Sequence, residues 1–388
     1  MAMESRARAA EVIAGLRALA PEIRARAAEA EAGRRIPPDL IGKLKAARVF
    51  RTFTPGSHGG LELDFADGLA VIREAARIDG SLGWVVMIGL AGPLLFARLP
   101  RSTFDDLFKH GPDLIQAGAA ATPGGYAEVA PGGYLTRGRW PFASGCQHAD
   151  VILGNCAVTE NGQPVIGPQG LPVTRLVVLP AEEFEIEDTW TVAGLKATGS
   201  HHTRLSERFV PDDRFFEMNG TSCLEGPLYN AMGPWIPLMH CAFAVGVAEG
   251  AIEDLVEAVG SGRRQLFARV AMRESPIFQY ELGRLDAELS AAVALMERCA
   301  DSHWSLAVDG RLNDPAAMPR SLQAGVWITL ACQGIASDAF NLGGGSALYD
   351  GSPLQRRMRD MHAGSQHALV QKQNYQGLGA GRLGEAAH

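Results

Sequence analysis

The spacing of hydrophobic and polar residues divides the chain into three regions, two with helical spacing and one between them with β-prone runs. Up to about residue 110, apolar residues recur with the spacing of an amphipathic helix. Ala/Arg/Glu-rich segments come first, and Asp39–Arg48, Phe65–Asp79, the apolar run ending near Leu99 and Ser102–Lys109 follow. This pattern predicts an N-terminal helical domain over residues 1–112.

The spacing changes between Leu114 and Met218. About seven or eight short β-prone runs are separated there by Gly, Pro and Asn turn signals, among them Val151–Leu153, Ala157–Thr159, Arg175–Leu179, Phe184–Glu187 and Arg204–Phe209. Runs of this length and spacing predict a compact antiparallel barrel or sandwich. We assign this central β domain to residues 113–222.

Helical spacing returns from about Leu228 in long blocks. Leu238–Val259, Pro276–Ala307 and Pro315–Phe340 are the longest, and a final helix is expected from Ser352 to about Val370. A C-terminal helical bundle over residues 223–388 follows. The predicted fold class is therefore α+β and mostly α.

Composition narrows the class of protein. Hydrophobic residues make up 47% and charged residues 20%, as in a globular protein, and a net charge of −7 argues against general nucleic-acid binding. The six cysteines form no CxxC pair and no Cys/His cluster, which predicts no metal site and a reducing, cytoplasmic location. The uncharged run Gly80–Ala97 contains Pro93 and is interpreted as a core helix of a soluble protein without a membrane span.

The segment Asn341–His367 carries the strongest functional signal. It passes from a glycine cluster through Arg-Arg-x-x-Arg-Asp and ends at a histidine. With the helix–strand–helix order and the turn-helix segment TPGSHGGLELDFADGLAVIREAARIDGSLGWV (54–86), it resembles the acyl-CoA dehydrogenase superfamily. Dehydrogenases of that family carry a catalytic glutamate near the position of His367. The RDxxxxxxH arrangement instead resembles the reduced-flavin-dependent (group D, two-component) monooxygenase and hydroxylase branch.

This resemblance implies a central antiparallel β-barrel, a C-terminal oligomerisation domain and two flavin-facing segments. In GRWPFASGCQHAD (138–150), the cofactor-binding residues would be Trp140, Phe142, Ala143, Ser144 and Gly145, and Ser144 would also be catalytic, at the N5 edge of the flavin. In DTWTVAGLKATGSHHTRLSERFVP (188–211), they would be Trp190, Thr198, Gly199 and Ser200. An aromatic strand followed by an ordinary turn is the alternative interpretation of the first segment. His201 and His202 are expected to be surface or loop residues.

Further cofactor contacts are implied nearer the C-terminus. Arg264 and Phe267 resemble residues that reach a neighbouring subunit's cofactor, although Ala268 stands where many relatives have Gly, and an exposed arginine remains an alternative. Gly344 and Gly345 are expected where the backbone closely approaches the cofactor or a neighbouring subunit.

His367 is the candidate catalytic residue. An ordinary histidine pKa of ~6.5 suits it to accept a proton from a phenol or to donate one to reduced oxygen, whereas a surface histidine is the alternative. Candidate substrate contacts are Trp84, Pro93, Leu94 and His362. Met87–Phe96 contains no histidine, so this wall of the pocket is expected to be apolar.

The expected function is that of a two-component flavin-dependent monooxygenase. The resemblance implies reduced FMN or FAD from a separate NAD(P)H:flavin reductase, O2 as co-substrate, a C4a-hydroperoxyflavin, and an aromatic or polyketide-like small molecule, in a homotetramer. Two alternatives stay open, an acyl-CoA dehydrogenase or oxidase and a non-catalytic scaffold of the same fold. The first needs a carboxylate near the flavin, where Asp350 lies early in the motif and Asp360 is expected to pair with its neighbouring arginines.

Overall fold

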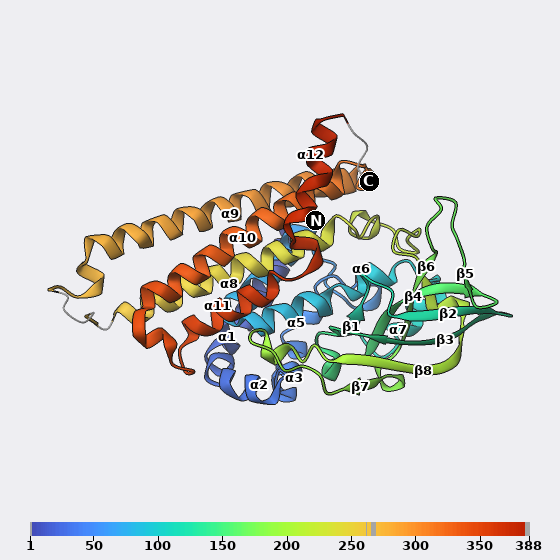
Figure 1. Ribbon diagram of the computed structural model, residues 1–388, viewed down its shortest axis with the longest axis horizontal. Helices are drawn as coiled ribbons and strands as arrows, with labels where there is room; N and C mark the ends of the chain where they lie inside the picture. Colours follow the sequence, from blue (N-terminus) through green and yellow to red (C-terminus); the bar gives the residue numbers. More distant parts are fainter. Residues whose placement is uncertain (1, 261, 265–268, 385–388) are drawn as a thin grey trace.

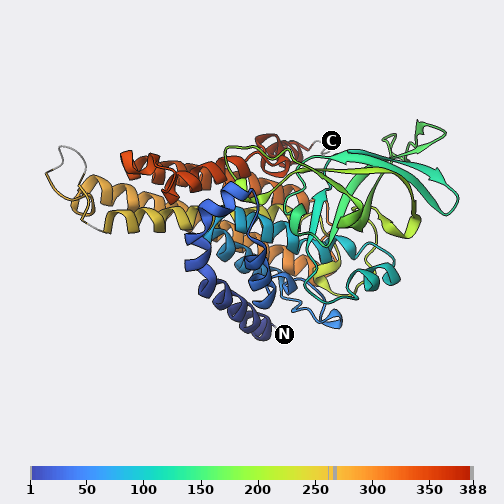
Figure 2. The same cartoon turned by 90° about the horizontal axis from the view of Figure 1, so that it is seen from below.

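The computed structural model describes residues 2–260, 262–264 and 269–384. Two views show the strands gathered at one end of the molecule and the long helices running side by side at the other (Figures 1 and 2). The N-terminal helices lie between these two parts and are α1 Ala2–Ala25, α2 Ala27–Gly33, α3 Pro38–Ala46, α4 Phe65–Ile78, α5 Gly80–Leu90, α6 Gly92–Phe96 and α7 Arg101–Leu107. The predicted order of helical, β and helical regions is confirmed.

The central sheet is not the closed antiparallel barrel that we expected. Its path is β7-β8-β3-β2-β4-β6-β9, with β1 and β5 also paired to β4, and the edge strands β7 and β9 do not pair with each other. Two pairings, β1 with β4 and β2 with β4, are parallel. The strands are β1 Gln116–Ala119, β2 Gly125–Ala130, β3 Gly133–Trp140, β4 Val151–Glu160, β5 Gln163–Pro164, β6 Thr174–Pro180, β7 Glu185–Glu187, β8 His202–Pro211 and β9 Phe215–Phe216. Residue alternation predicts a strand but not its direction or its partner, which is why the sequence missed this topology.

The C-terminal helices pack around α8, which is buried against α4 and α10. They are α8 Trp235–Gly260, α9 Pro276–Val308, α10 Ala317–Gly343, α11 Pro353–Gly364 and α12 Gln376–Arg382. By length and composition α8 could cross a membrane, but 83% of its apolar window is buried inside the fold. It is therefore apolar around its whole circumference because it is the core helix of the bundle.

The last predicted helix ends earlier than expected. Helix α11 stops at Gly364, and His367 lies in the following turn, before the short 3-10 helix Ala368–Val370. Gly364 is required because a Cβ at this position would lie 2.6 Å from the ring of Phe243 and 3.3 Å from that of Trp84. The close approach places the turn with His367 beside α5 and α8.

The expected pairing of Asp360 with its neighbouring arginines is wrong. Asp360 accepts a hydrogen bond from the backbone N–H of Leu195 at 2.6 Å, and no arginine among the described residues reaches it. Arg357, three residues earlier, instead pairs with Asp254 of α8 at 2.8 Å. Helix α11 thereby holds the loop around Leu195, which carries one wall of the site.

Candidate active site

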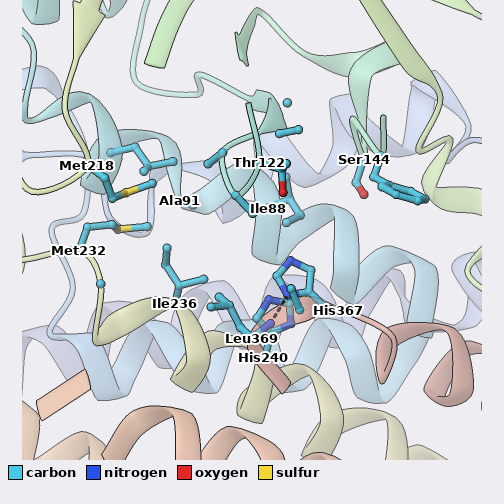
Figure 3. Close-up of a pocket in the computed structure, with 18 of the residues that line it drawn as sticks. Ile88, Ala91, Thr122, Ser144, Met218, Met232, Ile236, His240, His367 and Leu369 are labelled. Carbon is cyan, nitrogen blue, oxygen red and sulfur yellow. Dashed lines mark hydrogen bonds between the residues drawn. The ribbon is translucent and has the colours of Figure 1, made fainter. Parts of the chain in front are cut away.

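A cavity of about 1720 Å³ lies between the sheet, α5–α6, α8 and α11. Most of the surface that lines it is apolar. Figure 3 shows His240 and His367 on one wall, with Ser144 toward one end of the cavity and Met218 and Met232 toward the other. A large apolar cavity with a few converging polar groups is the usual form of a cofactor and substrate site.

One face of the α5–α6 segment forms a wall of this cavity. Trp84, Ile88, Ala91, Leu95 and Arg98 all line it, and their spacing of four, three, four and three residues puts them on one helical face. The candidates Pro93 and Leu94 do not line it, because this periodicity directs them to the opposite face, where both are buried. Within Met87–Phe96 the residues that line the cavity, Ile88, Ala91 and Leu95, are apolar, and Arg98 lies just beyond this range.

A chain of hydrogen bonds connects this helix to the two candidate flavin-facing segments. Trp84 Nε1 donates to Ser144 Oγ at 2.9 Å. Ser144 Oγ lies 2.7 Å from Ser200 Oγ, which lies 2.7 Å from Thr198 Oγ1. Thr198 donates to the Leu195 carbonyl at 2.8 Å, so the hydroxyl protons all point toward Leu195. Ser144 is thus left with acceptor capacity on its oxygen.

The other small residues of these segments shape the turns that hold the two serines. Gly145 and Gly199 have φ values of +77° and +53°, in the left-handed region that glycine adopts without strain. Gly145 N–H donates to Thr198 O at 2.8 Å, and Ala143 N–H donates to His201 O at 3.0 Å. These backbone bonds fix the segments against each other, whereas Ala143, Gly145, Thr198 and Gly199 do not line the cavity.

The aromatic candidates separate into two groups. Phe142 and Trp190 line the cavity, and their rings meet edge to face with centroids 6.3 Å apart. Trp140 is fully buried inside the sheet, where its Nε1 donates to Asn155 O at 2.7 Å. The structure therefore does not bring Trp140 to the cavity, because strand alternation turns it to the face opposite its neighbours.

The polar centre of the cavity is a pair of histidines. The rings of His240 on α8 and His367 lie side by side (Figure 3), with centroids 4.2 Å apart. The Trp84 ring meets both, with centroid distances of 5.3 and 6.0 Å. Burial lowers the pKa of His367 to about 4. Burial and the neighbouring imidazole hold the pKa of His240 well below its usual value. Both rings are therefore neutral at neutral pH.

The tautomer of His367 follows from a backbone contact. Its Nδ1 accepts a hydrogen bond from the N–H of Leu369 at 3.3 Å. A neutral imidazole that accepts at Nδ1 carries its proton at Nε2. His367 therefore presents a donor at Nε2, a choice between donor and acceptor that the sequence left open.

Sequence reasoning missed His240. The sequence indicated His362 as the second histidine and an apolar wall along Met87–Phe96, whereas His240 comes from the core helix of the C-terminal region. Its only local signal is one titratable residue within the apolar run Leu238–Val247. Such a residue, 3% exposed and without a hydrogen-bond partner among the described residues, is explained by the cavity it faces.

The remaining candidates are scattered. His362 lines the cavity and bonds to Gln333 and Ser337 at 2.8 and 2.9 Å. Arg264 and Gly345 are exposed and Gly344 is half-buried beside the end of α10, and none of the three lines the cavity. Phe267 lies outside the described residues.

Carboxylates are nearly absent from the cavity lining. Among residues 2–260, 262–264 and 269–384, Asp314 is the only one, and it pairs with Arg311 at 3.1 Å. Burial and the charge of Asp79 raise the pKa of Asp360 to about 7, but this side chain does not line the cavity. Over the same residues, no three His, Cys, Asp or Glu side chains are grouped to hold a metal ion.

The fold and the cavity together define a cofactor-binding protein of the acyl-CoA dehydrogenase fold. Residues 12–97 match the family described as "Acyl-CoA dehydrogenase, N-terminal domain" and residues 238–372 match "Acyl-CoA dehydrogenase, C-terminal domain". The chain belongs to this superfamily, in the branch of flavin-dependent monooxygenase oxygenase components.

Relatives support that branch along nearly the whole chain. The indole-3-acetate monooxygenase of Acinetobacter baumannii is 30% identical over 88% of this chain and 86% of its own length. The flavin-dependent monooxygenase oxygenase subunit HsaA of Rhodococcus jostii is 30% identical over 95% and 97%. The crystal structure of 3-HSA hydroxylase from Rhodococcus sp. superposes with a TM-score of 0.90 at 29% identity, over 97% of this chain and 98% of the other.

Proposed function

We propose that this protein uses reduced FMN or FAD and O2 to oxygenate an aromatic small molecule. The observation that carries the proposal is the neutral pair His240–His367 beside the hydroxyl chain of Ser144, in an apolar cavity. Named relatives act on indole-3-acetate and resorcinol, which supports an aromatic substrate.

The cavity fits a flavin and a substrate together. Ligand pockets typically hold ~300–1,000 Å³, and the 1720 Å³ found here exceeds that range. Phe142 and Trp190 offer aromatic faces to a ring system, and the acceptor oxygen of Ser144 complements the N–H that a flavin carries at N5 only when reduced. A bound reduced flavin supplies the two electrons that activate dioxygen.

The protein's own residues would hold and move protons around this chemistry. His367 Nε2 donates to an oxygen of the bound reactants. His240, whose ring has no hydrogen-bond partner among the described residues, is positioned to accept a hydrogen bond from a phenolic hydroxyl. The apolar residues around them, including Ile88, Leu95 and Ile236, exclude bulk water.

A dehydrogenase is less well supported. It needs a carboxylate base at the reacting carbon, but Asp314 is the only carboxylate lining the cavity in the described parts of the chain. Asp314 pairs with Arg311 at 3.1 Å, and its side chain remains 33% exposed to solvent.

The proposal extends to partners and location. The oxygenase component of a two-component system receives reduced flavin from a separate NAD(P)H:flavin reductase. We further propose a cytoplasmic homotetramer in which Arg264, Phe267, Gly344 and Gly345 act at a neighbouring subunit's cofactor. The exposure of Arg264 supports this arrangement.

The test compares the wild type with His367→Gln, supplied with reduced FMN or FAD, oxygen and a set of phenols and indoles. We expect the wild type to form oxygenated product, and the variant to bind reduced flavin within about twofold but to form ~100-fold less product, releasing hydrogen peroxide instead. Product yield per oxygen consumed is measured by chromatography and a peroxide assay. An unchanged yield in the variant, or no product with any substrate in the set, would contradict the proposal.

A further inference from the structure

Arg98 terminates the helical face that lines the cavity. Trp84, at the other end of that face, donates to Ser144, and Arg98 lies fourteen residues later. Ala91 separates α5 from α6 and Arg98 follows the end of α6 at Phe96, so the two positions lie at opposite ends of this segment. The segment after Met218 covers Arg98, since a Cβ at Gly220 would lie 3.5 Å from its Cγ. Arg98 therefore belongs to the methionine end of the cavity, remote from the histidines.

The guanidinium of Arg98 has little of the bonding that a buried cation needs. The residue is 8% exposed, Nη1 donates to Leu94 O at 2.6 Å, and Nε has no hydrogen-bond partner. Within the described parts of the chain, no carboxylate oxygen lies within 4.0 Å of it. Burial lowers its pKa to about 10, which still leaves it charged at neutral pH.

Two other arginines of this protein have the ion pairs and hydrogen bonds that Arg98 lacks. Arg357, 4% exposed, pairs with Asp254 and also donates to the carbonyls of Ala76, Arg77 and Ile78. Arg359 lines the same cavity as Arg98 but bonds to Glu31, Gln355 and the carbonyl of Ala193. An uncompensated buried charge is energetically costly. We therefore expect an anion that is not part of this chain to pair with the guanidinium of Arg98.

We propose that Arg98 binds the carboxylate of the substrate, and that the substrate is an elongated aromatic acid. Its aromatic ring lies at the histidines, its apolar middle lies along Ile88, Ala91 and Leu95, and its carboxylate pairs with the guanidinium. An Arg–carboxylate pair is charge-assisted and is strengthened by the apolar surroundings. This inference rests on the proposed function for the position of the ring, whereas the acid-binding site is defined by Arg98 alone.

The experiment measures binding rather than turnover. The probes are 4-hydroxyphenylalkanoic acids with two to ten methylene groups, each paired with its primary amide. Affinities are measured by isothermal titration calorimetry on the full chain, anaerobically, with and without reduced FMN. We expect at least one acid to bind about tenfold or more tightly than its amide, with an optimum at intermediate or long chains.

The variants assign the preference to one side chain. Arg98→Gln should bring acid and amide to within about twofold by weakening the acid alone, and Arg98→Lys should keep part of the preference. Arg359→Gln is the matched control, an arginine of the same cavity whose bonds are already made, and it should keep the preference of the wild type.

Two outcomes would overturn the proposal. One is a wild type in which no acid binds more tightly than its amide, and this outcome requires no variant to fold. The other is an Arg98→Gln protein that keeps the preference. A protein that prefers acids through Arg98 yet forms no oxygenated product would leave this site standing and remove the proposed function instead.

Discussion

The helical bundle and the cavity each contain a buried histidine and a buried arginine, but the number of hydrogen bonds that these side chains make differs between the two regions. In the bundle, the ring nitrogens of His303 lie within 3.0 Å of Cys299 O, Ala317 O and Ser321 Oγ, and Arg357 makes four hydrogen bonds. In the cavity, His240 has no hydrogen-bond partner among the described residues and Arg98 has one.

Burial alone therefore does not mark a functional residue. His303 and His240 are 1% and 3% exposed, and Arg357 and Arg98 are 4% and 8% exposed, so accessibility hardly distinguishes them. The number of hydrogen bonds that each side chain makes does distinguish them. A buried polar group without a partner costs free energy unless a ligand supplies one. Substitutions in matched pairs test this distinction.

The two arginine substitutions should differ most in their effect on the free energy of unfolding. Arg357→Met leaves Asp254 buried without its cation and should lower the free energy of unfolding by about 3–5 kcal/mol. Arg98→Met removes a cation that lacks a counter-ion and should change the free energy by no more than about 1 kcal/mol. Denaturant unfolding of both variants measures the difference. Equal losses would mean that Arg98 has a structural partner after all.

The histidines should differ less. Leucine has a volume close to that of histidine, so His303→Leu mainly removes the one N–H that the imidazole donates to a carbonyl and its hydrogen bond with the Ser321 hydroxyl, at a cost of about 2–3 kcal/mol. His240→Leu removes no hydrogen bond and should stay within about 1 kcal/mol. The same unfolding measurements check both values. A His240→Leu protein as unstable as His303→Leu would break the comparison.

The smallest expected effect is on the pH dependence of the free energy of unfolding. The pKa of His367 is about 4 in the folded protein and ~6.5 in the unfolded chain, so the unfolded state binds the proton more tightly. Stability is then lost as pH falls from about 6.5 toward 4, and nothing is lost above pH 6.5. Compared with His367→Gln, the wild type should lose about 2 kcal/mol more between pH 7 and about 5.

Comparison with the variant is needed because Asp360 acts in the opposite direction. Its raised pKa, about 7, means that the folded state binds this proton more tightly, so its contribution falls as pH rises through 4 to 7. Asp360 is present in both proteins, and its contribution cancels in the difference. Parallel pH profiles for the two proteins would show that the His367 ring is not shielded from solvent.

Most of the helices and several site residues follow from local patterns. Helical spacing predicted the long C-terminal blocks, and motif resemblance selected Ser144, Ser200, Trp190 and His367, which the fold does bring to one cavity. These residues are close to turns and element ends, where short segments have distinctive residue types. The sequence was informative where local geometry fixes the side chain.

It was uninformative where the site depends on packing between distant elements. His240 lies in the apolar helix α8 and Arg98 in the turn after α6, and they become site residues only when α8 and α5–α6 pack around the same space. Trp140 was expected at the cofactor but lies on the other face of the sheet, because a shift of one residue in strand register decides which face a side chain occupies. The open, mixed sheet was missed because pairing direction leaves no trace in alternation.

The bond from Trp84 to Ser144 also gives the protein a built-in optical signal. An indole at the wall of the cavity, with a second one at Trp190, emits in the wavelength range where flavins absorb. Arrival of the coenzyme should quench that emission by energy transfer, and no label has to be attached. Occupancy of the site is in this way readable in real time from the protein's intrinsic fluorescence.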